Sequence, residues 1–285
     1  MFTRIGKMTA PARMLTTVTS AFLVCLLLFS HAPLAETTRL VIKGSTTVLP
    51  IAQRIAEEFE RKCGNVEVGV SGGGSAEGIT ALIMGEADIA TSAAFITEDE
   101  LKLARQHDVY PVPFRVANDC ILPVVHNSNP LKNLSSEDLK KIYRGIINNW
   151  QQLGGPDLGI DVISRDTVSG TYEVWHNIIM EHEAVVTTQP LKHSNSEVVR
   201  AVSENPGAIG YIGLGYLNAS VKPLRVDGVI GSHQTLLDGS YSINRPLFMF
   251  SNGWPSGKTL EFINFVLDAD NGQQMIEDAG YIPLY

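Results

Sequence analysis

Short apolar segments that are typical of buried strands alternate along this chain with segments whose apolar residues recur at helical spacing. Residues 40–43 predict a strand, and the apolar residues of 48–59 recur every three or four positions, which predicts a helix. The same order returns at 66–70 followed by 79–83. Strands that alternate with helices in this way predict an α/β fold with mostly parallel sheets.

Further segments repeat these two patterns through the rest of the chain. We expect strands at 87–90, 109–125, 161–164, 209–212 and 245–250, and helices at 97–104, 135–143, 171–180, 196–203, 259–267 and 273–279. No internal repeat, low-complexity run or Ser/Gly linker interrupts the alternation. If the chain forms two lobes, strands connect them, and Phe114–Val125 is the best candidate for one crossing.

Residues 1–35 have the order of a secretory signal peptide. Arg4, Lys7 and Arg13 precede an apolar stretch from Leu15 to Phe29, and small residues follow it. The stretch is shorter than the roughly 20 apolar residues that a membrane-spanning helix needs. We expect cleavage after Ala35 and a periplasmic mature protein, with a retained membrane anchor as the alternative.

The charge of the chain excludes several kinds of partner. The formal net charge is −8, and it becomes −11 once the basic residues of the predicted signal peptide are removed. Acidic proteins bind nucleic acid and anionic membranes poorly. The apolar fraction of 44% and the charged fraction of 18% indicate a globular chain.

Three strand-to-helix turns are rich in hydroxyls and small residues. They are Gly44–Val48, Ser71–Gly78 and Arg165–Thr171. The first amides of a helix have no partner inside it, and the aligned peptide dipoles add positive charge there. In α/β sheets such turns gather at the carboxyl ends of the strands, so together they predict a site for a small oxyanion.

A single turn of this kind is more often an ordinary helix cap, since Ser and Thr are common capping residues. Three such turns in one chain favour binding. Arg165 adds a planar fork of donors suited to a tetrahedral anion, although an ion pair with Asp166 is the plainer interpretation.

Catalytic patterns are not recognisable in the sequence. Glu77 stands where a nucleophile elbow around Ser75 would need glycine, and 44–47 lack the lysine of a P-loop. His176 and His182 are not spaced to share a metal on one helical face. We therefore expect no enzyme activity, no metal and no cofactor.

The mature chain retains two cysteines, Cys63 and Cys120. An exported protein can join them in a disulfide, but Cys63 falls at a predicted helix end and Cys120 in a predicted strand. We expect two buried thiols, with a disulfide as the alternative.

The chain resembles the phosphate-binding proteins of bacterial phosphate ABC transporters over nearly all its mature length. The most specific matches are the R-x-x-x-S-G-T segment at 165–171 and P-G-A-I-G-Y at 206–211. Others are 44–50, 71–75, 131–134, 142–150, 245–249 and 280–284.

This resemblance implies a two-lobed type II periplasmic binding protein whose chain crosses between the lobes twice. Residues 36–118 and 243–285 would form lobe 1, and residues 119–242 would form lobe 2. The ligand would lie in the cleft, and the lobes would close on it by a hinge motion.

The resemblance also implies the binding residues. They are Ser45, Thr46, Thr47, Gly74, Ser75 and Ser92 in lobe 1, and Arg165, Ser169, Gly170 and Thr171 in lobe 2. Thr47 would bind through its amide. The family's phosphate site also uses an aspartate as proton acceptor, and here Ala93 stands in its place. Asp119, near the crossing, is a candidate for a replacement acceptor.

The resemblance implies a monomer that captures inorganic phosphate and delivers it to an inner-membrane permease and ATPase complex. Two alternatives remain. One is binding or sensing of another tetrahedral oxyanion such as sulfate or molybdate, and the other is a periplasmic phosphatase.

Overall fold

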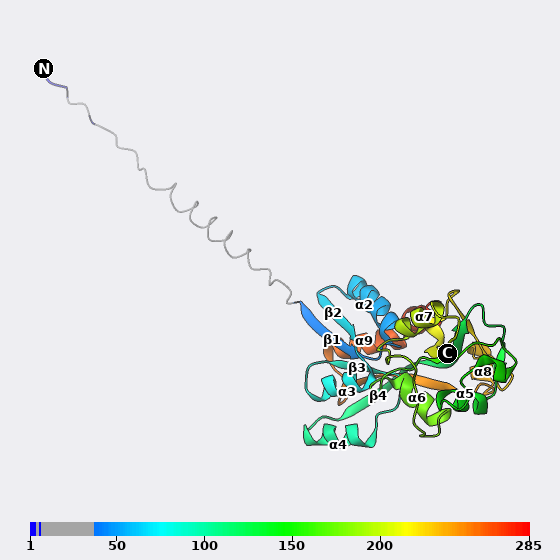
Figure 1. The fold of residues 1–285 in the computed structure, drawn as a ribbon. Coiled ribbons are helices and arrows are strands. Elements are labelled where there is room, and N and C mark those ends of the chain that lie inside the picture. The colour runs from blue at the N-terminus through cyan, green and yellow to red at the C-terminus, as the bar shows by residue number, and fades with distance from the viewer. Residues whose placement is uncertain (4–5, 7–36) are drawn as a thin grey trace. The chain divides into compact units, whose positions relative to one another are not determined.

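The computed structural model describes residues 1–3, 6 and 37–285 (Figure 1). The predicted cleavage site and nearly all of the predicted signal peptide lie outside these residues. Thr38–Tyr285 forms one compact unit. None of the helices in the described part of the chain is both long and apolar enough to span a bilayer.

The unit alternates strands and helices in the predicted order. Its strands are β1 (Thr38–Gly44), β2 (Val66–Gly72), β3 (Ile89–Ser92), β4 (Pro111–His126), β5 (Asn133–Leu134), β6 (Asp161–Val162), β7 (Ala208–Gly213), β8 (Val221–Pro223), β9 (Arg225–Val226) and β10 (Asn244–Asn252). Its α-helices are α2 (Leu49–Cys63), α3 (Ser75–Ile83), α4 (Glu98–Gln106), α5 (Ser136–Tyr143), α6 (Gly170–Ile178), α7 (Asn195–Ser203), α8 (His233–Leu237), α9 (Gly257–Leu267) and α10 (Gln274–Asp278). Shorter turns are η1 (Trp150–Leu153), η2 (Leu214–Tyr216) and the π-helical η3 (Ala269–Gln273).

The large sheet is mixed, so the expectation of mostly parallel sheets is wrong. Its strand order is β2-β1-β3-β10-β4-β7-β6, with β8 paired to β4. β1 pairs in parallel with β2 and β3, and β6 with β7. The two long strands β4 and β10 run antiparallel to each other and to their other neighbours, because the chain leaves along one and returns along the other.

β4 is the strand predicted to cross between lobes. It has 16 residues, and its three prolines do not break it as the sequence suggested. Its first half pairs with β10, and its second half, from Ile121, pairs with β7.

Separate hydrophobic cores lie on either side of this crossing. One core contains residues between Leu40 and Ala117 together with residues between Leu247 and Tyr281. The other contains residues between Cys120 and Ile243, with Ile282 added from the C-terminal segment. We call the elements around these cores the first and the second lobe.

The two cysteines of this unit are free thiols, and only one is buried. Cys120 lies in the second core and Cys63 is exposed at the end of α2, so the expectation of two buried thiols is wrong for Cys63. Burial raises the pKa of the Cys120 thiol to about 12, which makes it unreactive at neutral pH.

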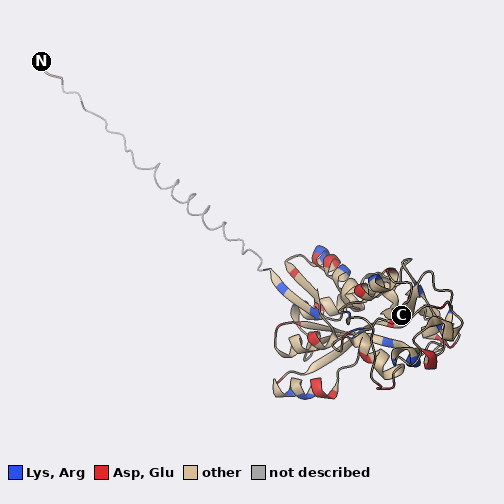
Figure 2. Ribbon diagram, in the orientation of Figure 1, with Lys and Arg blue, Asp and Glu red and all other residues tan. Residues whose placement is uncertain are grey.

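Charged side chains lie mainly on the outer helices. Figure 2 shows acidic and basic residues along α2 and α4, whereas most of the ribbon between them carries neither. The Thr97–Glu100 capping box predicted at the start of α4 is present, with the Thr97 hydroxyl accepting from the Glu100 amide and the Glu100 carboxylate from the Thr97 amide. This interior is where buried polar groups can decide binding.

Candidate functional site

The register of β1 brings two of the predicted turns together. Gly44 pairs with Gly72 at the end of β2 and with Thr91 at the end of β3. These strands are parallel, so their carboxyl ends lie at one edge of the sheet. A Cβ at Gly44 would lie 2.2 Å from the Thr91 carbonyl oxygen, so only glycine permits this approach.

The first turn buries Ser45, Thr46 and Thr47. The Thr47 amide, predicted to bind the ligand, donates to Ser45 Oγ at 3.1 Å instead. The hydroxyl of Tyr216 donates to the Thr46 carbonyl, and that of Tyr281 donates to the Thr47 carbonyl at 2.7 Å. The backbone is thereby fixed, and the two threonine hydroxyls remain to contact the second lobe.

The second turn contributes a hydroxyl and a close approach. Ser75, the first residue of α3, is buried and accepts from the Ala93 amide at 3.1 Å. The amide of Gly74 donates to the Gly44 carbonyl, so it is already used within the lobe. A Cβ at Gly74 would lie 2.7 Å from the carbonyl oxygen of Val168 in the second lobe. Gly74 therefore allows the lobes to meet.

Ser92 is not brought into the hydroxyl cluster. Its Oγ donates to the Ala94 carbonyl at 2.8 Å and accepts from the Ala94 amide at 3.2 Å. This hydroxyl is satisfied within its own turn.

The third turn starts α6 and meets the second one. Ser169 Oγ accepts from the amides of Thr171 and Tyr172 at 3.2 and 3.3 Å, which is the geometry of a helix cap. A Cβ at Gly170 would lie 2.5 Å from Ser75 Oγ and 3.0 Å from the Ala93 carbonyl carbon. Gly170 thus permits the start of α6 to lie directly against the first lobe.

Arg165 is the most unusual residue of the site, because its guanidinium is buried without a carboxylate partner among the described residues. Its Nε donates to the Lys192 carbonyl at 3.0 Å, and Nη2 donates to the His193 carbonyl and to Thr46 Oγ1. In the described part of the chain its Nη1 has no partner. Burial lowers the pKa of this guanidinium, which is the physical sign of a cation that lacks its counter-charge. The alternative of an ion pair with Asp166 is not observed, because that carboxylate contacts His193.

Thr47 Oγ1 is a meeting point of four side chains. It lies 3.1 Å from Thr171 Oγ1, and it accepts from Asn195 Nδ2 at 3.1 Å and from Arg245 Nη2 at 3.2 Å. Sequence reasoning missed Asn195 and Arg245. An arginine at the start of an apolar strand was a usable signal for Arg245, whereas Asn195 looked like part of a helix start.

Asp119 is occupied by Arg245 and does not face a ligand as a spare acceptor. Both groups are buried, and Asp119 Oδ2 accepts from Arg245 Nε at 3.1 Å and from Nη2 at 2.8 Å. Asp119 Oδ1 accepts from the Leu214 amide at 2.9 Å. Burial raises the pKa of Asp119, and the adjacent guanidinium opposes that rise.

The structure therefore joins most of the predicted residues into one buried cluster. Hydroxyls of both lobes, a guanidinium with an unpartnered donor and the starts of α3 and α6 converge on it. Such donors suit a small anion with several oxygens. Ser45 and Gly74 support the cluster, and Ser92 lies apart from it.

This fold and this site define a class. The chain is a two-lobed type II periplasmic binding protein, with β4 and β10 as the strands that connect the lobes. The model of the PBP superfamily domain matches residues 31–270. The chain belongs to the PstS-like family of phosphate-binding proteins within that superfamily.

Relatives and solved structures agree with this assignment. The chain is 31% identical over 253 residues to the phosphate-binding protein PstS of Borreliella burgdorferi, covering 85% of this chain and 88% of the relative. It is 29% identical over 249 residues to PstS of Bacillus subtilis, covering 86% and 80%. The structure of a putative phosphate ABC transporter substrate-binding protein with bound phosphate from Clostridium perfringens superposes with a TM-score of 0.81 at 29% identity, covering 87% of this chain and 100% of that one.

Proposed function

We propose that this protein binds inorganic phosphate between its lobes and delivers it to an inner-membrane ABC transporter. The observation that carries the proposal is Arg165 Nη1, a buried cationic donor without a partner among the described residues, set beside the hydroxyls of Thr46 and Thr171. The names of the relatives in B. burgdorferi and B. subtilis support phosphate as the ligand.

The number of donors is sufficient for useful affinity. Micromolar binding requires about −8 kcal/mol, and a hydrogen bond to a charged group contributes roughly 1.5–3 kcal/mol. Arg165 and the hydroxyls of Thr46, Ser75, Ser169 and Thr171 supply at least five donors. The acidic surface opposes capture, but its field decays over about 8 Å in physiological salt, whereas the donors touch the ligand.

We place the lobe boundaries as the sequence predicts, with residues 36–118 and 243–285 in lobe 1 and residues 119–242 in lobe 2. The separation of the two cores supports this division. The protein would act as a periplasmic monomer without turnover, with a permease and ATPase complex as its partner.

Isothermal titration of the purified protein with inorganic phosphate tests the proposal. We expect saturable 1:1 binding of micromolar affinity or tighter, and no heat with nitrate or chloride. Absence of saturable phosphate binding at millimolar concentration would refute the proposed function.

Gly170→Ala should weaken phosphate binding without unfolding the protein. The added methyl meets Ser75 Oγ and the Ala93 backbone, so the lobes cannot close fully. Overpacking of this kind costs about 1–3 kcal/mol, which is about 5- to 150-fold in Kd. Titration calorimetry measures the loss, and small-angle scattering measures the closure.

Gly69→Ala on β2 is the matched control, because nothing lies within 4 Å of a Cβ at that position. Its affinity should equal that of the natural protein. If Gly170→Ala also binds as tightly, the close approach of α6 to the first lobe is not required for binding.

A further inference from the structure

The hydrogen-bond contacts around Thr47 fix the direction of its proton. A hydroxyl has one hydrogen and can accept two hydrogen bonds. Asn195 Nδ2 and Arg245 Nη2 are both donors to Thr47 Oγ1, so they use its accepting capacity. The Thr47 hydrogen must therefore go to its third neighbour, Thr171 Oγ1, 3.1 Å away. Thr171 accepts this bond and keeps its own hydrogen for a ligand.

The other hydroxyls are polarised in the same sense. Ser169 Oγ already accepts from two backbone amides, so it can only donate. Thr46 Oγ1 accepts from Arg165, and Ser75 Oγ accepts from the Ala93 amide. Each of these oxygens is a partner of a donor, and the hydrogen of each hydroxyl remains available to an anion.

Carboxylates near the cluster do not supply a fixed acceptor. Asp119 is taken by Arg245 and by the Leu214 amide. Asp166 follows Arg165 in an extended segment, where consecutive side chains point to opposite sides, and its Oδ2 contacts the exposed His193.

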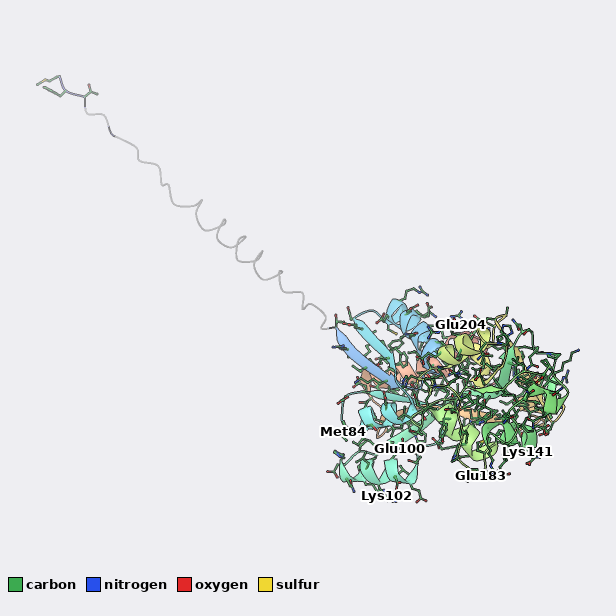
Figure 3. The ribbon with its side chains drawn as sticks, viewed as in Figure 1. Met84, Glu100, Lys102, Lys141, Glu183 and Glu204 are labelled. Atoms are coloured by element: carbon green, nitrogen blue, oxygen red, sulfur yellow. The ribbon has the colours of Figure 1, made fainter. Side chains whose placement is uncertain are left out.

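Glu173 is the remaining carboxyl group close to the site. It follows Gly170 by three residues on α6, so it lies on the helix face that meets the first lobe. Burial raises the pKa of Glu173 to about 7, and the charge of Glu100, labelled in Figure 3 and part of the first turn of α4, adds to the rise. The charge of Arg245 opposes it.

We propose, on the basis of the proposed function, that the site offers its ligand donors and no obligatory acceptor, and therefore binds fully ionised tetrahedral dianions, sulfate as well as doubly ionised phosphate. An ionised carboxylate can only accept, so it would repel an anion without a proton. Hydroxyls and a guanidinium carry no such repulsion. The proton of a monoanionic phosphate finds no fixed acceptor in this site.

Titration calorimetry with phosphate and with sulfate at about pH 8 tests the proposal. We expect the two dissociation constants to agree within about tenfold, since one such factor corresponds to 1.4 kcal/mol. Tight phosphate binding with sulfate more than tenfold weaker would overturn the inference and leave the proposed function intact. Failure of both anions to bind would refute the proposed function and this inference together.

The pH dependence of the ratio gives a second, independent readout. Sulfate keeps its charge between about pH 5.5 and pH 8, whereas phosphate loses a proton near neutrality. Titration of Glu173, His193 or other protein groups affects both anions and largely cancels in the ratio. We expect phosphate to gain on sulfate as the pH rises; a ratio that is flat or falls would contradict the inference.

Glu173→Gln distinguishes the competing explanation. In a donor-only site this substitution leaves the ratio of sulfate to phosphate affinity within about threefold of that of the natural protein. A rise of more than tenfold in relative sulfate affinity would show that Glu173 acts as the acceptor, and it would overturn the inference.

Discussion

Arg165→Ala is expected to abolish high-affinity phosphate binding. The guanidinium is 1% exposed, and its unpartnered Nη1 is the one buried cationic donor of the described chain left for a ligand. Truncation of one member of a buried hydrogen-bonded charge pair costs 2–5 kcal/mol or more, about 30-fold to several thousand-fold in Kd. Titration calorimetry with phosphate measures the effect.

Arg165→Lys separates charge from geometry. Lysine keeps the positive charge and loses the planar fork, so an intermediate affinity is expected. Arg144→Ala is the control, because Arg144 forms an ion pair with Glu183 at a partly exposed position and should leave binding unchanged. Thermal unfolding checks that loss of the contacts to the Lys192 and His193 carbonyls does not unfold the protein. If folded Arg165→Ala binds phosphate as tightly as the natural chain, Arg165 is not a ligand.

Asp119→Ala should cause the largest loss of folding stability. Asp119 and Arg245 are 0% and 2% exposed in their side chains, and removal of the carboxylate leaves a buried guanidinium without its counter-charge. Breaking a buried pair in this way costs about 3–5 kcal/mol. Chemical denaturation in the absence of phosphate measures the free energy of unfolding.

Two controls define what this loss means. Asp99→Ala removes an ion pair with Lys102 whose side chains are 91% and 64% exposed, and it should change stability by less than about 1 kcal/mol. The double variant Asp119→Leu/Arg245→Met removes both buried charges and should recover much of the lost stability. An unchanged free energy of unfolding in Asp119→Ala would show that the pair does not stabilise the connection between the lobes.

Local patterns predicted the elements and most of the hydroxyls of the site. The capping box at Thr97, the helix starts at Ser75 and Ser169 and the crossing strand depend on residues that are close in sequence, so periodicity and helix-start chemistry reveal them. The same patterns misjudged strand direction, because the pairing of β4 with β10 joins segments more than 100 residues apart and leaves no local signal.

Long-range contacts decided which polar groups are available. Nothing near Thr47 in the sequence shows that Asn195, 148 positions away, and Arg245, 198 positions away, both donate to its hydroxyl. Likewise the occupation of Asp119 by Arg245 removes the replacement acceptor that the sequence suggested.

The sequence by itself determined the alternation of strands and helices, the turns with hydroxyls and the family, because these depend on the order of residue types along short segments. The tertiary structure alone decided which lone pairs are occupied and which hydrogens remain for a ligand. The reason is physical: a hydrogen bond depends on position and angle within a fraction of an ångström, and only the packed lobes set that geometry between distant residues.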